Sequence, residues 1–344
     1  MSSVIGVDLG GTKVAVAPLV GRHFGDSVLL PTDRSGSGNL IEQLVAMVGR
    51  VRGESLDAVG IGVPSIVEFD TGRVVSSVNV PLKDVPLRQV LGERLGVPVF
   101  VDNDATVAAL AEAHDAELRL VAHNLVMITV GTGVGGGIVL GGRIYRGATG
   151  GAGELGHTLV GLDLSREAVP APTGFPQPGS LEAVAAGHAL DKLALRAAEF
   201  VPDSALGRLK AQGKEVAGAE AVDCAEHGDP AAQRIIEIWA ERVGIGIANA
   251  INTFDPEEVV IGGGAARAGD RLLEPAKRVA LGYVVPGLGR RTSVRLAWHG
   301  VRAGVLGAAL LAAQEIEAQV GGLRSGFGGS NSAADASSGV EARG

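Results

Sequence analysis

Cysteine and aromatic residues are scarce in this chain. Its 344 residues include one cysteine, Cys224, which excludes an internal disulfide framework and a metal site built from several cysteines. Aromatic residues make up 3% of the chain, so its cores must consist mainly of Val, Leu, Ile and Ala. Hydrophobic residues reach 46%, and the length is sufficient for two domains with substantial cores.

Positive charge is also in deficit. The formal net charge is −8, and the sequence has no basic stripe that would follow a phosphate backbone, which argues against nucleic acid as a partner. No run of about 18 apolar residues lacks glycine or polar interruptions, so we expect no membrane span. Met1-Ser2-Ser3-Val4 runs into a strand pattern without a charged leader or cleavage site. These features predict a soluble, cytoplasmic α/β protein.

Glycine, in contrast, is abundant, with 53 residues that cluster between apolar segments. The first cluster, Asp8-Leu9-Gly10-Gly11-Thr12-Lys13, lies between two apolar runs and predicts a β-hairpin. Its N–H groups could form an anion nest, with the Thr12 hydroxyl as a further donor, but an ordinary hairpin turn is the alternative. It is not a Walker A loop, because its lysine follows the threonine and the next element is a strand.

Two more glycine clusters follow strand patterns. Thr129–Gly137 holds five glycines in nine residues and repeats the first plan of strand, turn and strand. Gly262-Gly263-Gly264 follows a short apolar run, where a turn requiring positive φ explains the glycines equally well. Taken together, the three clusters favour nucleotide binding, and the repeated hairpin suggests two related domains facing a shared cleft.

Polar residues follow another predicted strand, Pro98–Val101. Asp102-Asn103-Asp104 stands where ligands bind in open α/β sheets, before an Ala-rich helix predicted to reach about Glu117. One of the three could simply cap that helix, but capping needs a single side chain, so a functional role for at least one is favoured. Gly153–His157 places an acid and a histidine in a glycine-rich loop, with a solvated surface loop as the alternative. Glu182, taken alone, fits a structural role in the first turn of a helix.

The alternation of strands and helices predicts an α/β fold with largely parallel or mixed sheets. Residues 1–117 would form a small first domain, joined by a C-terminal helix at about 302–318. Residues 118–301 would form a large second domain, strongly helical after Glu182. The Gly/Ser/Ala-rich segment 319–344 is expected to be a disordered tail.

In combination, these segments resemble the ROK family of sugar kinases and sugar-responsive repressors, and most of all its glucokinases. The resemblance runs from Val4 to about Ala313 and implies two actin-like ATPase (ribonuclease H-like) domains flanking a central cleft. It rests on seven motifs in order: Asp8 to Lys13, Gly62-Val63-Pro64, Asn79-Val80-Pro81, Asn103-Asp104, Gly131 to Gly137, Gly150 to His157, and Gly262-Gly263-Gly264.

The resemblance implies ATP-dependent phosphorylation of a hexose, with glucose as the first choice, and Asp104 as the catalytic base. Asp8 would position Mg²⁺, through water. The sugar-binding residues would be Asn79, Asn103, Asp104, Glu154, His157 and Glu182. For Glu182, this role replaces the structural one given above. The residues along ATP would be Gly10, Gly11, Thr12, Lys13, Thr132 and Gly133 at the phosphates, and Gly262 and Gly263 at the adenosine.

Two departures from the family pattern stand out. The family usually holds a structural zinc with three cysteines and a histidine that matches His157, but the segment Thr173–Glu182 contains no cysteine. We therefore expect no zinc, and a loop stiffened instead by prolines that narrow its unfolded-state freedom, namely Pro170, Pro172, Pro176 and Pro178. The second departure is Ser65, where the family often has glycine.

Several alternatives remain open from sequence. N-acetylglucosamine, N-acetylmannosamine, mannose or fructose could be the substrate, and polyphosphate could replace ATP. A repressor of the same family would carry a helix-turn-helix domain before the first motif, where only Met1-Ser2-Ser3 stand, so that reading is disfavoured. A non-catalytic sugar-binding protein is the remaining rival. The resemblance also suggests a homodimer.

Overall fold

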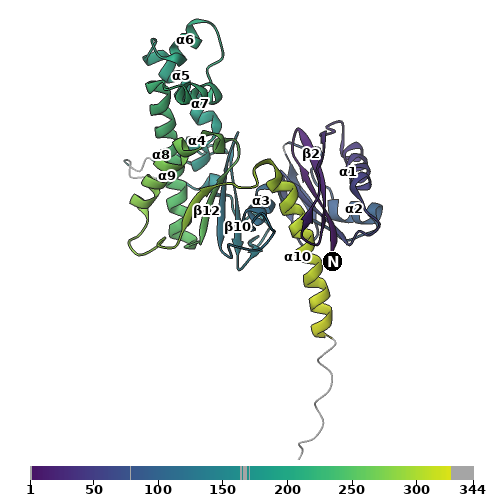
Figure 1. Ribbon diagram of the computed structural model, residues 1–344. Helices are drawn as coiled ribbons and strands as arrows, with labels where there is room; N and C mark the ends of the chain where they lie inside the picture. Colours follow the sequence, from purple (N-terminus) through teal and green to yellow (C-terminus); the bar gives the residue numbers. More distant parts are fainter. Residues whose placement is uncertain (1, 78, 163–164, 166–168, 170, 327–344) are drawn as a thin grey trace, which may run out of the picture.

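Two mixed β-sheets form the centres of two lobes in this computed structural model, which describes residues 2–77, 79–162, 165, 169 and 171–326 (Figure 1). The first sheet has the order β3-β2-β1-β5-β8, with β4 paired to β2. Its strands are β1 (Ser3–Leu9), β2 (Lys13–Val20), β3 (His23–Phe24), β4 (Val28–Pro31), β5 (Ala58–Val63) and β8 (Val99–Asn103).

The second sheet has the order β11-β10-β9-β12-β13. Its strands are β9 (Leu125–Val130), β10 (Val134–Leu140), β11 (Arg143–Ile144), β12 (Glu258–Gly262) and β13 (Ser293–Leu296). A separate two-stranded sheet pairs β6 (Ser65–Glu68) with β7 (Arg73–Ser77).

Both large sheets follow one plan. In each, an antiparallel hairpin (β1/β2 or β9/β10) is extended by two parallel strands (β5 and β8, or β12 and β13). The hairpins predicted around the first two glycine clusters are thus confirmed. The parallel strands point their carboxyl ends to one edge of each sheet, where ligands bind in α/β folds.

The helices divide between the lobes. Those of the first lobe and the junction are α1 (Ser37–Val51), α2 (Leu87–Leu95), α3 (Asp104–Glu112) and α10 (Ala303–Gly326). Those of the second lobe are α4 (Leu181–Ala185), α5 (Gly187–Phe200), α6 (Ala205–Ala211), α7 (Gly218–Glu226), α8 (Pro230–Phe254) and α9 (Asp270–Tyr283). Short 3₁₀ turns are η1 (Leu155–His157), η2 (Gly264–Ala268) and η3 (Gly300–Arg302). Among the described residues, no helix combines the length and apolarity needed to cross a bilayer.

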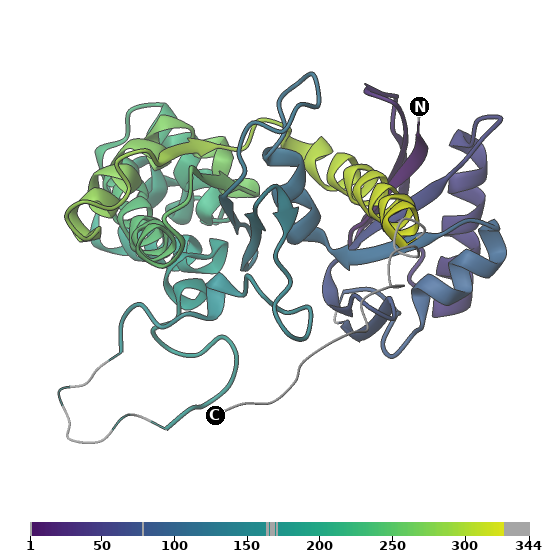
Figure 2. The same ribbon diagram turned by 90° about the horizontal axis from the view of Figure 1, so that it is seen from below.

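Helix α10 returns from the second lobe and packs on the first sheet, as Figures 1 and 2 both show. The contact is close because two strand residues lack side chains: a Cβ at Gly6 would collide with Val305 O, and one at Gly60 with Ala308 O.

Helices α1 and α2 pack into the other core of this lobe through buried Leu, Met and Val side chains. Helix α10 continues to Gly326, past the predicted end at residue 318, and residues 327–344 lie outside the described part of the chain.

Helix α3 ends earlier than the sequence predicted, at Glu112 rather than about Glu117. The cause is a side-chain-nucleated turn: Asp115 Oδ1 accepts hydrogen bonds from Glu117 N at 3.0 Å and Arg119 N at 2.9 Å. Asp commonly competes with helical hydrogen bonding in this way. The chain therefore leaves the helix early and crosses to β9 in the second lobe.

That crossing lies against the second one, which leads from β13 back to α10. The fully buried Glu112 carboxylate accepts hydrogen bonds from Arg295 Nη1 at 2.7 Å and from the backbone N–H groups of Trp298 and His299, both at 2.9 Å. His299 Nε2 lies 2.9 Å from His114 O. One carboxylate therefore ties the two interlobe connections together.

Candidate active site

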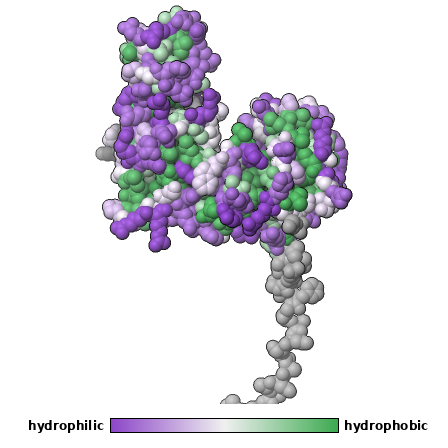
Figure 3. Space-filling model, in the orientation of Figure 1, coloured by the Kyte–Doolittle hydropathy of each residue, from purple (hydrophilic) through white to green (hydrophobic). Residues whose placement is uncertain are grey.

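A cavity of 560 Å³ lies between the lobes, beside the ends of β1, β8 and β9 and the start of α10. The space-filling view shows the surface hollowed between the two bodies (Figure 3). Eight residues singled out from the sequence line this cavity: Asp8, Asn79, Asn103, Asp104, Gly133, Glu154, Glu182 and Gly263. We call it the central cavity.

Asn103 and Asp104 divide two tasks at the start of α3. Asn103 is the helix cap: its Oδ1 accepts hydrogen bonds from Ala105 N at 2.9 Å and Thr106 N at 3.2 Å, while its Nδ2 donates to Ser65 O at 3.4 Å. Capping of α3 therefore does not depend on Asp104. Its Oδ1 still accepts a hydrogen bond from Ala105 N at 2.8 Å. The buried Ser65 hydroxyl has no hydrogen-bond partner among the described residues.

Burial is the main influence on the Asp104 carboxylate. It raises the pKa of Asp104 above the ordinary range, and the Ala105 N–H opposes this while the negative charge of Glu154 adds to it. A carboxylate in such a setting accepts a proton more readily than one in water. Such a carboxylate can act as a proton acceptor.

Asp8 faces the same space from the end of β1. Burial, reinforced by the Asp104 carboxylate, raises the pKa of Asp8 to about 6. Gly304 keeps this space open, because a Cβ there would lie 2.5 Å from Asp8 Cγ. A divalent cation would relieve the repulsion between the two carboxylates, and Mg²⁺ typically uses one or two carboxylates together with water and phosphate oxygens. The residues present therefore fit Mg²⁺.

Asp102 does not reach the cavity. It is buried and pairs with Arg146 at 2.7 Å, and Arg146 also contacts Glu315 on α10 at 3.2 Å. The Arg146 guanidinium stacks on Phe69, 3.4 Å from the ring centroid. The Asp102 carboxylate also accepts a hydrogen bond from the Asn103 N–H at 2.9 Å. The ion pair of Asp102 and Arg146 therefore supports the start of α3 from outside the cavity.

Glu154, His157 and Glu182 come from the glycine-rich loop and α4. Glu182 accepts a hydrogen bond from Val134 N at 2.8 Å, across the second glycine turn. The Ser180 hydroxyl caps α4 by accepting from Ala183 N at 3.2 Å. His157 Nε2 lies 3.7 Å from Glu154 Oε2, but His157 does not line the central cavity.

The surroundings of His157 do not fit the zinc that the family pattern implies. A structural zinc needs four nitrogen or sulfur ligands, and the ring that contacts His157 is Phe175, edge-on with centroids 5.2 Å apart. Within the described ranges, no three His, Cys, Asp or Glu side chains converge as metal ligands, and Cys224 lies on α7. Pro170, one of the prolines expected to stiffen this loop, lies outside the described residues. The absence of zinc stays our prediction, and stoichiometric zinc in the purified protein would contradict it.

The base of this loop is closed by backbone hydrogen bonds instead. Val160 N and Gly161 N both donate to Gly179 O, at 2.8 and 3.0 Å, and Leu181 N donates to Thr158 O at 2.9 Å. These bonds tie the segment after His157 to the segment before Glu182.

Six predicted nucleotide residues, and His157, do not line the central cavity. The six are Gly10, Gly11, Thr12, Lys13, Thr132 and Gly262. Gly11 nevertheless adjoins it, since a Cβ there would lie 3.1 Å from the Cβ of Asn79. The first turn is held by Gly10 N donating to Lys13 O at 2.9 Å and by the Thr32 hydroxyl donating to Gly10 O at 2.7 Å. These two hydrogen bonds fix the Gly10–Lys13 turn beside the edge of the central cavity.

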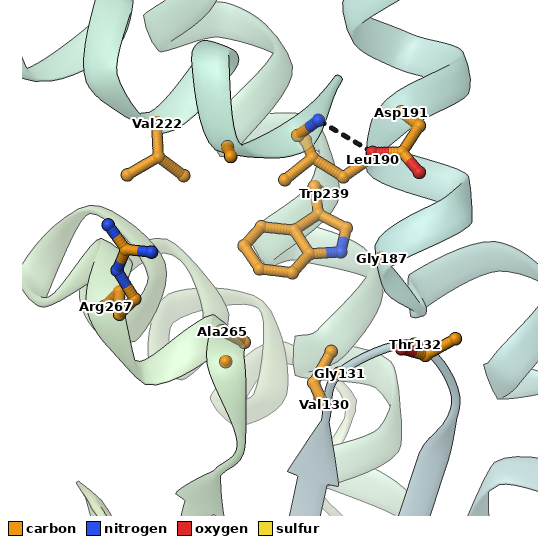
Figure 4. Close-up of a pocket in the computed structure, with 13 residues that line it drawn as sticks. Val130, Gly131, Thr132, Gly187, Leu190, Asp191, Val222, Trp239, Ala265 and Arg267 are labelled. Atoms are coloured by element: carbon orange, nitrogen blue, oxygen red, sulfur yellow. Dashed lines mark hydrogen bonds between the residues drawn. The ribbon is translucent and has the colours of Figure 1, made fainter. Parts of the chain in front are cut away.

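A second cavity, of 450 Å³, continues the site into the large lobe (Figure 4). Gly131 lines both cavities, and Thr132 lines the second. Gly263 has φ 79°, and a Cβ there would lie 2.5 Å from Val130 O, so only glycine fits where the third cluster passes β9. The cavity is also lined by Gly187, Leu190, Asp191, Gly218, Ala219, Val222, Trp239, Gly264, Ala265 and Arg267.

Sequence reasoning missed the polar and aromatic residues of this second cavity. Asp191 Oδ1 accepts the Gly218 N–H at 2.7 Å (Figure 4). Trp239 Nε1 donates to Ala185 O at 2.7 Å. Arg267 extends from η2 at the rim. The low aromatic content makes a tryptophan notable, but nothing local in the sequence places Trp239 beside Gly131.

Comparison with known proteins adds to this geometry. The family model described as "ROK family" matches residues 4–315. A glucokinase of Halalkalibacterium halodurans is 35% identical over 326 residues, which cover 90% of this chain and 95% of that protein. Two crystal structures have TM-scores of 0.72. The ROK family glucokinase from Streptomyces griseus in complex with glucose and AMPPNP is 30% identical (91% of this chain, 100% of that one), and the ROK hexokinase from Thermus thermophilus is 35% identical (92% and 99%). The two lobes therefore have the expected actin-like ATPase fold.

Proposed function

Because the chain belongs to the ROK family, we propose that it transfers the γ-phosphate of ATP to a hexose, with glucose as substrate and glucose 6-phosphate as product. One observation carries this proposal. Asp104 lines a cavity with Asn103, Glu154 and Glu182, and that cavity shares Gly131 with a second one of a size that suits a nucleoside.

The sugar would lie in the central cavity. Asn79, Asn103, Glu154 and Glu182 offer amide and carboxylate groups to its hydroxyls, and His157 would join them when the loop closes on the sugar. All of these groups bond hydroxyls without regard to the sugar that bears them. The choice of glucose therefore rests on the family likeness and not on residue types.

ATP would extend from the central cavity into the second one. The glycine turns at Gly10–Lys13 and Thr132–Gly133 would present N–H groups to the phosphates. The adenosine would lie in the second cavity, beyond Gly263 of the central cavity, against Trp239 and within reach of Asp191. Asp8 would hold Mg²⁺ through water, and the ion would supply charge neutralisation at the phosphates.

Asp104 would accept the proton of the attacking hydroxyl. Phosphoryl transfer has a loose transition state, so the proton leaves late and the orientation of the hydroxyl matters most. The raised pKa of Asp104 strengthens it as the acceptor, while the hydrogen bond from Ala105 fixes its direction. Closure of the lobes would exclude water, which could otherwise take the phosphate.

The alternatives are other hexose or amino-sugar substrates, polyphosphate as donor, and a non-catalytic sugar-binding protein. An assay of ADP release, run over glucose, mannose, fructose, N-acetylglucosamine and N-acetylmannosamine, separates the substrates. A parallel assay with polyphosphate follows the sugar phosphate directly. We expect the highest kcat/KM with glucose and ATP. Sugar binding without turnover on any donor would support the binding protein instead. The proposed homodimer is checked by light scattering.

A further inference from the structure

A third cavity, of 300 Å³, lies in the second lobe and shares no lining residue with the central or second cavity. It is open to solvent on one side and is lined by the segment after η1 and by helices α4, α5 and α8. We call it the basic pocket, and its lining consists of Val160, Gly161, Ala183, Val184, Ala189, Lys192, Leu193, Arg196, Arg242 and Ile245.

Among the residues that the structure describes, three cations and no carboxylate line the basic pocket. Lys192 and Arg196 stand at i and i+4 on α5, where like charges are neighbours and destabilise a helix. Neither has a hydrogen bond or ion pair with any residue in the described part of the chain. Arg242, from α8, donates one hydrogen bond to Val184 O at 3.1 Å. In a chain of net charge −8, the exposed Lys192 and Arg196 therefore lie together with the half-buried Arg242, and no carboxylate among the described lining residues offsets their charge.

We propose that the basic pocket binds a phosphate monoester. Two guanidinium groups suit phosphate oxygens, which they can bind in pairs, and Lys192 adds a third positive charge. A dianion balances this set better than a single carboxylate would. The remaining wall is apolar, from Val160, Leu193, Ile245 and their neighbours, so there is room for a compact organic group beside the phosphate.

The basic pocket is connected by short covalent and hydrogen-bonded links to the segments that carry His157 and Glu182. Val160 and Gly161 are the residues whose N–H groups bond Gly179 O, and Ala183 directly follows Glu182 on α4. A ligand bridging these walls would stabilise the arrangement that holds Glu182 against Val134 N. This coupling rests on the proposed function. A phosphate monoester in the basic pocket would raise the affinity of the central cavity for sugar, and bound sugar would raise the affinity of the basic pocket for the monoester by the same factor.

Isothermal titration with glycerol 3-phosphate tests binding, because this monoester lacks a hexose ring. We expect the double variant Lys192→Gln/Arg196→Gln to bind at least about tenfold more weakly than the wild type. The matched control is Arg290→Gln/Arg291→Gln, which removes the same charge from exposed residues outside the three cavities and should bind like the wild type. Circular dichroism verifies that each variant folds.

The outcomes are distinct. Equal affinity in the two double variants would overturn the proposal, and so would binding of inorganic phosphate without binding of glycerol 3-phosphate. A second titration, of glucose with and without saturating glycerol 3-phosphate, measures the coupling, and an unchanged glucose affinity would refute it. If no sugar binds at all, the proposed function fails, while the first titration still decides the basic pocket.

Discussion

At the scale of single residues, three consecutive polar side chains at the end of β8 have three different environments. Asp102 is buried in an ion pair, Asn103 caps α3, and Asp104 faces the central cavity. The sequence predicted that capping could not explain all three. It could not assign Asp102, because its partner Arg146 is 44 positions away and meets it only in the folded chain.

Asp104→Asn should lower kcat at least about 100-fold while leaving the KM for sugar nearly unchanged. The amide can still accept the Ala105 N–H and bond a hydroxyl, but it cannot take the proton. Steady-state kinetics with glucose and ATP measure the effect. Asp203→Asn, an exposed carboxylate outside both cavities, serves as the control. Turnover close to wild type in Asp104→Asn would remove Asp104 from the proposed mechanism.

His114 gives the fold a dependence on pH. Burial lowers the pKa of His114 below its ordinary value of about 6.5, opposed by the bond from Nδ1 to Leu110 O and reinforced by His299. The unfolded chain therefore binds a proton more readily than the folded one. The contribution to stability is fully present above about pH 6.5 and is lost as pH falls through the lower folded pKa.

Urea unfolding between pH 5 and 8 measures this dependence. We expect the midpoint to decrease as the pH falls below about 6.5, and to decrease less in His114→Gln, which retains a donor for Leu110 O. An identical pH profile for variant and wild type would show that His114 does not carry the effect.

At the scale of elements, sequence patterns predicted those strands and turns whose formation depends on neighbouring residues in the chain. The hairpins β1/β2 and β9/β10 follow from glycine turns between apolar runs, and both are present. The early end of α3 depends on hydrogen bonds of Asp115 with residues two and four positions on, which helix periodicity does not reveal. The extent of α10 was also underestimated.

The candidate site shows the same division. Asp8, Asn103 and Asp104 of the central cavity stand at strand ends, which sequence patterns can identify. Asn79 and Glu182 were indicated only by the family resemblance. The second cavity assembles Asp191, Trp239 and Arg267 from three separate helical segments, and each looks like an ordinary surface or core residue in its own segment. Tertiary packing alone places them together.

At the scale of the whole molecule, the two connections between the lobes depend on Glu112. We expect Glu112→Gln to destabilise the protein by about 3 kcal/mol, because the amide would turn an N–H group toward other donors and leave Arg295 without its full partner. Urea unfolding gives the value. Glu117→Gln, which weakens an exposed pair with Arg119, should change stability by less than about 1 kcal/mol. Equal effects of the two substitutions would contradict this reading of Glu112.

The return of α10 to the first sheet has a consequence for biosynthesis. Residues 125–296 contain both the second sheet and its helices, so that lobe has all its parts before α10 has been made. The first lobe, although made earlier, has one face of its sheet uncovered at Gly6 and Gly60 until residues 303–326 leave the ribosome. Domains usually fold in the order of synthesis, and here we expect the reverse. A nascent chain arrested before residue 303 should therefore protect its second lobe from protease sooner than its first.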